Sequence, residues 1–388
     1  MPNDKEQLLP LTSIRFFLAL WVVVFHQTDT FGYLAEWLLA LPEPAVSFFK
    51  TGYVAVSVFF VLSGFILAYN YSLLRSWSSA ELRRFAVSRF ARIYPVYCVG
   101  LVLVAPLVIR TARNTAPDAS LGSLLGSAAV HSLLLQSWVP QIALSWNAPG
   151  WSLSDEAFFY LCFPFIGVAL WSASRLRSVL LLAVAVWVTA SIAPLVAVAL
   201  PLNGFGNVPA TSSLPDAEIL WANLVKFNPL IRLPEFCGGV LAARIFQMLR
   251  ASGNPLSQAG YLLYVPALLL EAAALAFADA IPYPLIHNGL LLPLHAMAII
   301  GLALGGGILP RILSWPPLVF LGGASYSMYI LHAPVAMWID FIAERYFHVH
   351  IVGFNFAAMY VFLVVCLAGF VFTVIEEPAN RFWRKRLC

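Results

Sequence analysis

The chain of 388 residues is 61% hydrophobic and 10% charged, whereas soluble globular chains carry about 25% charged residues. This composition excludes a soluble enzyme, and a formal net charge of +4 without a basic domain argues against a nucleic-acid partner. The five cysteines form no CxxC pair and no cluster of His, Cys and carboxylates stands out, so we expect neither a disulfide framework nor a metal site.

Eleven apolar stretches approach the roughly 20 residues that span a bilayer. If the polar stretch 121–139 does not span the membrane, the cytoplasmic loops hold 15 Lys and Arg residues and the outer loops hold 5. If it spans, the cytoplasmic loops hold 8 and the outer loops hold 12. We therefore predict an all-α polytopic protein with both termini cytoplasmic, a core at about 10–380 and residues 111–150 as an outer-face excursion, lying on the bundle or re-entrant. The ten expected transmembrane helices are 11–29, 52–74, 94–110, 151–172, 179–200, 231–249, 259–279, 287–308, 318–339 and 351–375.

The first predicted helix carries Arg15 and, eleven positions later, His26. Eleven residues are almost three helical turns, so both side chains share one face, roughly 16 Å apart along the axis. Ionisable groups inside a spanning helix are costly and usually face a bundle interior or a wet cavity. One interpretation is an active site with a base and an anion-holding arginine. The other is that Arg15 snorkels to the interface and His26 is an inert, hydrogen-bonded residue.

A loop of four arginines precedes the third predicted helix, and Arg89 and Arg92 are three residues apart. On a helix these two guanidinium groups share a face, which suits phosphate oxygens. Arg84 in the same loop is a further candidate phosphate ligand. A topology signal or a lipid-headgroup contact is the alternative for the cluster. In the second predicted helix, Ser63 and Gly64 are small residues that allow close helix packing.

The segment Trp151–Tyr160 opens the fourth predicted helix. Ser152 and Asp155 have the spacing of a capping box, so we assign Asp155 to the helix N-terminus. Glu156 is then left at the outer end of its helix, where His26 is also expected. A carboxylate and an imidazole at one depth predict a catalytic dyad, and a Glu–His or Glu–Arg pair that holds the bundle together is the alternative.

Three later features complete the set of candidates. Arg232 and Glu235 have opposite signs at i,i+3 and are interpreted as a mutually neutralising pair. His332, two residues before Pro334, is interpreted as a packing histidine. Residues 379–388 form a basic cytoplasmic tail.

These pieces together resemble the acyltransferase-3 family of integral membrane acyltransferases, over about residues 10–380. The resemblance is carried by seven stretches in register: Arg15–His26, Phe59–Phe65, Arg89–Pro95, Trp151–Glu156, Arg232–Phe236, Ser325–His332 and Glu376–Pro378. It implies transfer of an acyl group, often acetyl, from cytoplasmic coenzyme A to a glycan hydroxyl at the membrane of a bacterial cell. It also implies that His26 is the catalytic base, Arg15 its partner in the same helix, Glu156 a site carboxylate, and Arg89 and Arg92 donor contacts.

The expected partners are therefore acyl-CoA as co-substrate, a hydroxyl-bearing acceptor and the bilayer of the inner membrane. Two rival readings share the same residues. In the first, the acceptor is a small secondary metabolite such as a macrolide. In the second, the chain is a proton-coupled transporter or flippase, because intramembrane Arg, His and Glu also mark transport.

Overall fold

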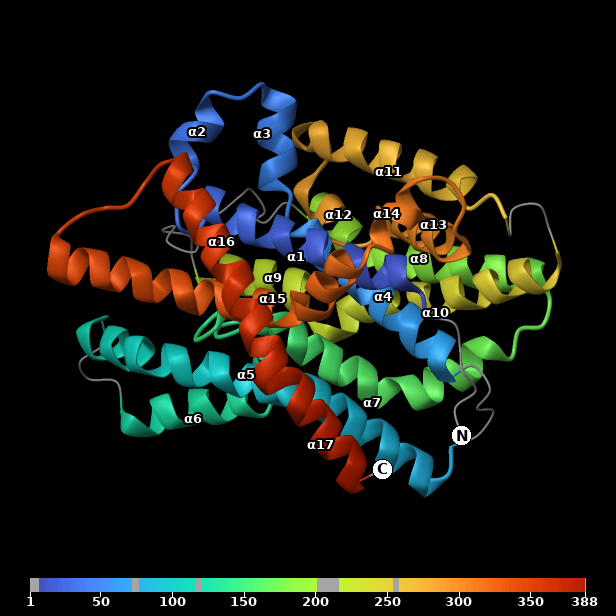
Figure 1. Cartoon of the computed structure of the whole chain (residues 1–388), viewed down its shortest axis with the longest axis horizontal. Helices are drawn as coiled ribbons and strands as arrows, with labels where there is room; N and C mark the ends of the chain where they lie inside the picture. The colour runs from blue at the N-terminus through green and yellow to red at the C-terminus, as the bar shows by residue number, and fades with distance from the viewer. Residues whose placement is uncertain (1–6, 72–76, 116–119, 201–215, 254–257, 388) are drawn as a thin grey trace.

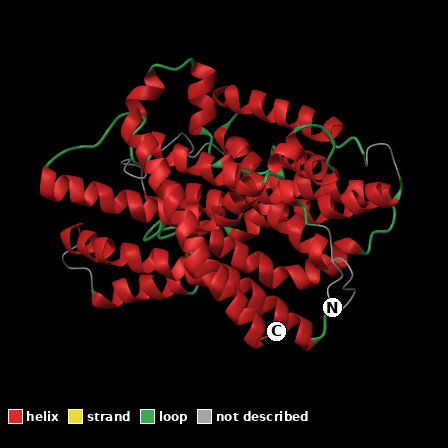
Figure 2. Cartoon of the chain, in the orientation of Figure 1, coloured by secondary structure: helices red, strands yellow, loops and turns green. Residues whose placement is uncertain are grey.

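The computed structural model describes residues 7–71, 77–115, 120–200, 216–253 and 258–387. Within these ranges the chain is helical and contains no strand (Figure 2). Its α-helices are α1 (Leu9–Thr28), α2 (Ala35–Leu39), α3 (Glu43–Lys50), α4 (Val54–Tyr71), α5 (Ser79–Thr115), α6 (Leu121–Ser132), α7 (Trp151–Trp171), α8 (Leu176–Ala199), α9 (Asp216–Phe227), α10 (Pro229–Ala251), α11 (Tyr261–Ala276), α12 (Tyr283–His287), α13 (Leu292–Leu304), α14 (Leu309–Leu313), α15 (Pro316–Ile342), α16 (Phe354–Val371) and α17 (Glu377–Leu387). The all-helical prediction is confirmed.

Eight helical segments of the described chain are long and apolar enough to cross a membrane. They are Leu9–Thr28, Val54–Tyr71, Ser79–Asn114, Ala148–Trp171, Leu176–Ala199, Tyr283–Leu304, Pro316–Phe347 and Phe354–Trp383. Each corresponds to a predicted span. The other two predicted spans are also helices, but α10 carries four charged residues and α11 has 16 residues, fewer than the roughly 20 that cross a bilayer. The number of ten and the cytoplasmic position of both termini stay predictions.

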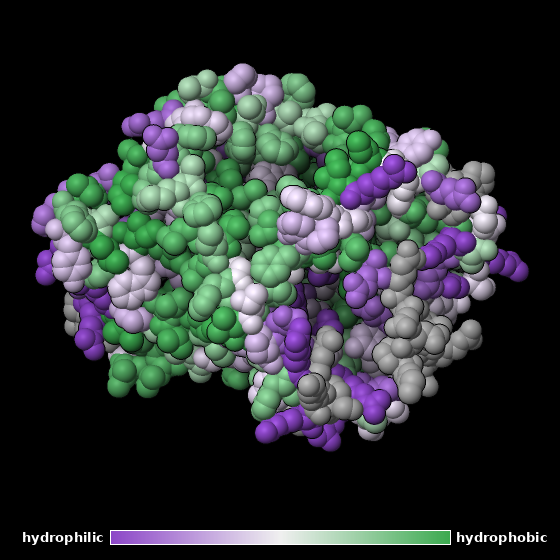
Figure 3. Space-filling model, in the orientation of Figure 1, coloured by the Kyte–Doolittle hydropathy of each residue, from purple (hydrophilic) through white to green (hydrophobic). Residues whose placement is uncertain are grey.

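Hydrophobic side chains cover the middle of the face in Figure 3, as expected for a surface that contacts lipid. Hydrophilic side chains gather around α17 and the beginning of α5. In Figure 1 α1, α4, α10 and α15 lie in the middle of the bundle, α11 lies at one edge, and α5 with α6 lies at the opposite edge. The functional candidates on α1 are therefore surrounded by protein.

Two glycines set the crossing of α4 and α10. A Cβ atom on Gly64 would lie 2.0 Å from the Phe236 carbonyl oxygen, and one on Gly239 would lie 2.0 Å from the Val61 carbonyl oxygen. The two backbones therefore touch, as small residues allow in membrane helices. The predicted packing role of Gly64 agrees with this geometry.

α1 and α15 run side by side in the same direction. Near their beginnings, a Cβ atom on Gly322 would lie 2.1 Å from the Thr12 carbonyl oxygen. Farther along, His26 of α1 meets His332 of α15. These two contacts fix the register between the helix that carries Arg15 and His26 and its main neighbour.

The segment between α6 and α7 folds back into the bundle. Gln136, Ser137 and Asn147 are buried, and α6, with 12 residues, is too short to span a bilayer. The Asn147 side-chain amide donates to the Ile330 carbonyl oxygen at 3.0 Å. Pro334 has no N–H group, so it leaves this i−4 carbonyl without its helical partner, and Asn147 replaces the missing donor.

We expect Gly64→Ala to lower the thermal unfolding temperature of the purified protein in detergent, because its methyl group would push α4 and α10 apart at a cost of about 1–3 kcal/mol. The matched control is Gly126→Ala in α6, where a Cβ atom meets nothing within 4 Å. Equal unfolding temperatures of the two variants would contradict the close crossing.

Candidate functional site

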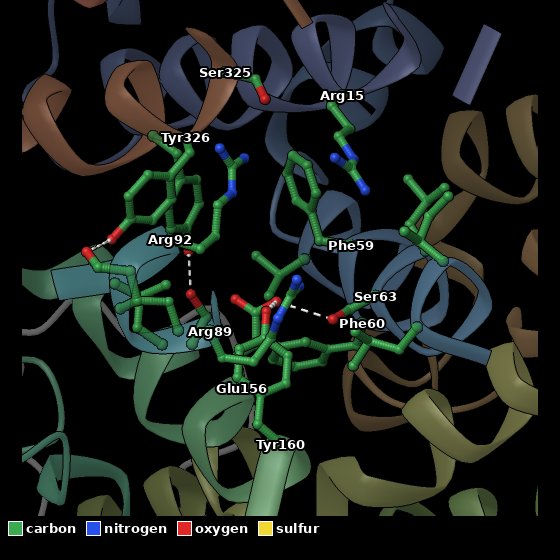
Figure 4. Close-up of a pocket in the computed structure, with 18 of the residues that line it drawn as sticks. Arg15, Phe59, Phe60, Ser63, Arg89, Arg92, Glu156, Tyr160, Ser325 and Tyr326 are labelled. Carbon is green, nitrogen blue, oxygen red and sulfur yellow. Dashed lines mark hydrogen bonds between the residues drawn. The ribbon is translucent and has the colours of Figure 1, made fainter. Parts of the chain in front are cut away.

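A cavity of about 300 Å³ lies between α1, α4, α5, α7, α15 and α17. Its wall includes Arg15 of α1, Arg89 and Arg92 of α5, and Glu156 of α7, so the structure brings together four residues that the sequence singled out. In Figure 4 these side chains converge from opposite walls, with Arg15 on one side and Glu156 with Tyr160 on the other. The cavity is therefore charged and lies within an otherwise apolar bundle.

Arg15 makes no hydrogen bond or ion pair with the residues that the structure describes, and its guanidinium lies at the cavity wall (Figure 4). A guanidinium group carries five N–H donors and no acceptor. An unpaired cation at this depth is costly unless it faces water or an anion. Arg15 is thus the candidate anion-binding group of the cavity.

Arg89 and Arg92 extend from successive turns of α5 toward the same space. Arg92 forms an ion pair with Glu376 and lies over the Tyr326 ring at 5.3 Å. Arg89 lies over the Tyr160 ring at 5.6 Å. Arg92 is held by a carboxylate, whereas Arg89 is held by an aromatic ring, which leaves more of its N–H donors available.

Glu376 reaches Arg92 from a π-helical turn, Phe372–Glu376, that joins α16 to α17. Its second carboxylate oxygen accepts from the Ser327 hydroxyl at 2.6 Å. Asn380, in the next turns of α17, also lines the cavity, and its side-chain oxygen is buried without a hydrogen-bond partner in the described part of the chain. The C-terminal helix therefore belongs to the site as well as carrying basic residues.

The predicted dyad of Glu156 and His26 is wrong. Glu156 accepts hydrogen bonds from Ser63 at 2.9 Å and from Tyr160 at 2.5 Å, at the arginine cavity. The first residues of α7, Trp151 to Asp155, are buried in the bundle, and one turn into this helix Glu156 faces the cavity and not the His26 ring.

The predicted capping box is also wrong. α7 begins after a 3-10 turn, Ala148–Gly150, and its N-cap residue is Gly150, with no side-chain cap. Ser152 instead donates to the Pro149 carbonyl oxygen at 3.0 Å and contacts the Tyr329 hydroxyl at 2.9 Å. Asp155 is fully buried, and neither of its oxygens has a hydrogen-bond partner within the described ranges.

His26 pairs with another histidine, His332 of α15. The His26 Nδ1 and His332 Nε2 atoms are 3.2 Å apart, and the ring centroids are 5.0 Å apart. His332 is fully buried, and both of its ring nitrogens have polar partners. The residues are 306 positions apart in the sequence, so only the fold could reveal the pair.

Tyr329 connects the arginine cavity to the histidine pair. Its side chain lines the cavity, and its carbonyl oxygen lies 2.7 Å from His332 Nδ1. The sequence offered one signal, a run of Ser and Tyr before His332 in an apolar helix, but did not show which face these residues occupy.

Two candidates lie away from the cavity. Arg84 is exposed on α5 and is not among the cavity-lining residues. Arg232 and Glu235 are buried and form an ion pair at 3.1 Å, as predicted. Arg232 also donates to the His287 carbonyl oxygen at 2.8 Å, so it joins α10 to the end of α12.

No group of three or more His, Cys, Asp and Glu residues with the geometry of a metal site occurs in the part of the chain that the structure describes. The chemistry of this cavity is carried by arginines, a carboxylate and hydroxyl groups. Such a set suits an anionic organic ligand.

The fold and the site thus define a multi-pass membrane protein with a cationic internal cavity. The chain matches the family model of the acyltransferase domain over residues 11–376, and it belongs to the acyltransferase-3 family. The resemblance found in its motifs is confirmed, and the protein is a membrane acyltransferase.

Two curated proteins show the relationship. The chain is 28% identical over 406 aligned residues to the acyltransferase MdmB of Streptomyces mycarofaciens, covering all of this chain and 95% of that protein. It is 36% identical over 107 residues to protein 2 in the picA locus of Rhizobium radiobacter, covering 28% of this chain and 49% of that protein. No solved structure matches the chain.

We expect Arg232→Met to reduce the free energy of unfolding by about 3–5 kcal/mol, because it leaves the Glu235 carboxylate buried without its partner. The double variant Arg232→Met with Glu235→Gln removes both charges and should recover part of this loss. Thermal or denaturant unfolding in detergent measures both effects. A single variant as stable as the wild type would show that the pair is not needed.

Proposed function

We propose that this chain transfers an acyl group, acetyl in the simplest case, from coenzyme A to a hydroxyl group of a membrane-associated glycan. The observation that carries the proposal is the unpaired Arg15 guanidinium at the cavity, on the same helix and face as His26. The two residues are eleven positions apart, or roughly 16 Å along the helix. The pantetheine arm of coenzyme A is about 20 Å long when extended, by the same chain dimensions as a peptide.

In this proposal the phosphates of coenzyme A bind at the arginine end of the cavity. Arg89 and Arg15 supply free N–H donors, and Arg92 supplies a positive charge that Glu376 holds in place. Arg84, on the exposed surface of α5, adds attraction at the entrance. This end then faces the cytoplasm, where coenzyme A is found, which agrees with the cytoplasmic termini predicted for a bacterial inner-membrane protein.

In this proposal Glu156 binds the donor and is not the partner of His26. Its carboxylate is oriented by Ser63 and Tyr160 and lies opposite Arg15 in the cavity (Figure 4). An ionised carboxylate only accepts hydrogen bonds, so it suits an amide N–H or hydroxyl of the pantetheine arm. Because Ser63 and Tyr160 both donate to Glu156, neither hydroxyl is the first choice for stabilising an oxyanion.

The thioester end lies toward Tyr329 and Ser152, whose hydroxyl groups are 2.9 Å apart at the inner wall of the cavity. Both hydroxyl groups also contact the Pro149 carbonyl oxygen, at 3.0 and 3.2 Å, so they are polar neighbours of the thioester and are not assigned as donors to its carbonyl oxygen. His26 lies beyond Tyr329, linked to it through His332. In the proposed reaction His26 removes the proton of the acceptor hydroxyl, and that oxygen attacks the thioester carbon.

We expect His26→Ala to abolish transfer or hydrolysis of radiolabelled acetyl-CoA by the purified protein in lipid, while the protein still inserts and keeps its unfolding temperature. The matched control is His350→Ala in an exposed loop, which should behave as the wild type. A mixed glycan pool and a macrolide are tested as acceptors in parallel. Labelling of the macrolide alone would show that the acceptor is a small metabolite and not a glycan. Wild-type turnover by His26→Ala would overturn the proposal.

We expect Arg89→Gln to raise the KM for acetyl-CoA by about 10- to 100-fold, since a hydrogen bond to a charged group contributes about 1.5–3 kcal/mol. The KM for the acceptor should not change. Arg113→Gln, at the exposed end of the same helix, is the control. Arg89 is the better test than Arg92, because removing Arg92 would leave buried Glu376 unpaired. An unchanged donor KM in Arg89→Gln would remove α5 from the donor site.

A further inference from the structure

The contact between His26 and His332 determines which nitrogen of His26 is available for catalysis. His332 Nδ1 lies 2.7 Å from the Tyr329 carbonyl oxygen, and its Nε2 lies 3.2 Å from His26 Nδ1. His26 Nδ1 also lies 3.0 Å from the Val22 carbonyl oxygen. The Tyr329 carbonyl, the two imidazole rings and the Val22 carbonyl therefore form one chain of contacts.

The positions of the hydrogens follow from these partners. A carbonyl oxygen only accepts, so His332 Nδ1 carries a hydrogen and donates it to Tyr329. In the neutral ring, His332 Nε2 then has a free lone pair. His26 Nδ1 faces two acceptors, the Val22 carbonyl oxygen and this lone pair, so it must be the protonated nitrogen of His26. His26 Nε2 is left unprotonated, and no hydrogen bond from the described residues reaches it.

We propose that His332 is a positioning residue, which orients the His26 ring through Nδ1–H and leaves Nε2 as the base that acts on the acceptor hydroxyl. This inference rests on the proposed function of His26. In the step, the acceptor O–H proton moves to His26 Nε2 while the acceptor oxygen bonds to the thioester carbon. The C–S bond then breaks, and the coenzyme A sulfur leaves with the electron pair and takes the proton from His26 Nε2.

His332 stabilises the protonated form of His26 and also orients the His26 ring. While His26 carries the proton it is an imidazolium ion, and its Nδ1–H bond to the His332 lone pair becomes charge-assisted. A carboxylate does this in serine hydrolases. Here no carboxylate has a hydrogen bond or ion pair with either ring within the described chain, and the second imidazole takes that place. Tyr329 of α15 and Tyr360 of α16 are the titratable groups that contact His332.

Three contacts fix the backbone of α15 around His332. The Tyr360 hydroxyl donates to the His332 carbonyl oxygen at 2.6 Å. Asn147 donates to the Ile330 carbonyl oxygen two residues earlier. Gly322 allows α15 to lie directly against α1. These contacts fix the α15 backbone at the point where it carries His332.

The first test compares His332→Gln with His332→Leu in the acetyl-CoA assay. The Gln amide extends about as far as Nε2 and can accept from His26 Nδ1, whereas Leu fills similar volume without an acceptor. We expect His332→Leu to lower kcat by about 10- to 100-fold, as loss of a partner that orients a functional histidine does, without changing the KM for acetyl-CoA. His332→Gln should recover most of the loss. Equal losses in Gln and Leu variants of unchanged unfolding temperature, or no loss in Leu, would overturn the inference.

The second test needs no acceptor. Nitrogen-15 NMR of the histidine-labelled protein in lipid distinguishes a protonated from an unprotonated ring nitrogen, and His26→Asn identifies the signals of His26 among the seven histidines. We expect Nδ1 of His26 to be protonated and Nε2 to be unprotonated at neutral pH. The opposite assignment would overturn this inference even if turnover requires His26, whereas turnover without His26 would overturn the proposed function itself.

Discussion

The packing of α1 against α15 is the constraint on which the rest of the site depends. Gly322 lets the two backbones meet near their beginnings, and the two imidazoles meet farther along. Since one residue turns a helix by about 100°, a shift of one position would turn both Arg15 and His26 away from their present surroundings. One helix pair thus sets the positions of Arg15 and His26 together.

Charge is distributed unevenly in the interior. Arg232 is neutralised by Glu235, and Arg92 is neutralised by Glu376. Arg15 has no such partner within the described residues, although a cation inside an apolar bundle is costly. The difference separates two cations that are paired inside the bundle from one that faces the cavity, as the proposed donor site requires. The cavity around Arg15 provides the space such a site requires.

The sequence predicted much of the site because helical spacing decides which side chains share a face. Arg89 with Arg92, and Arg232 with Glu235, are close in sequence, and their geometry followed from i,i+3 spacing. The pair of His26 and His332 could not be predicted, because spacing along one helix does not show which helices are neighbours. Glu156 was misplaced because its helix begins inside the bundle, after a buried turn that its hydrophobicity does not reveal.

The π-helical turn Phe372–Glu376 has a consequence for comparing related chains. A π-turn contains one residue more than the α-helical turn it replaces. Loss of a single residue there would restore a regular helix and rotate Glu376 by about 100° relative to the residues before it. Arg92 and Ser327 would then lose their carboxylate partner although every motif was still present. A one-residue gap at this position in a relative therefore changes the cavity wall near Arg92 without changing any residue of the motifs.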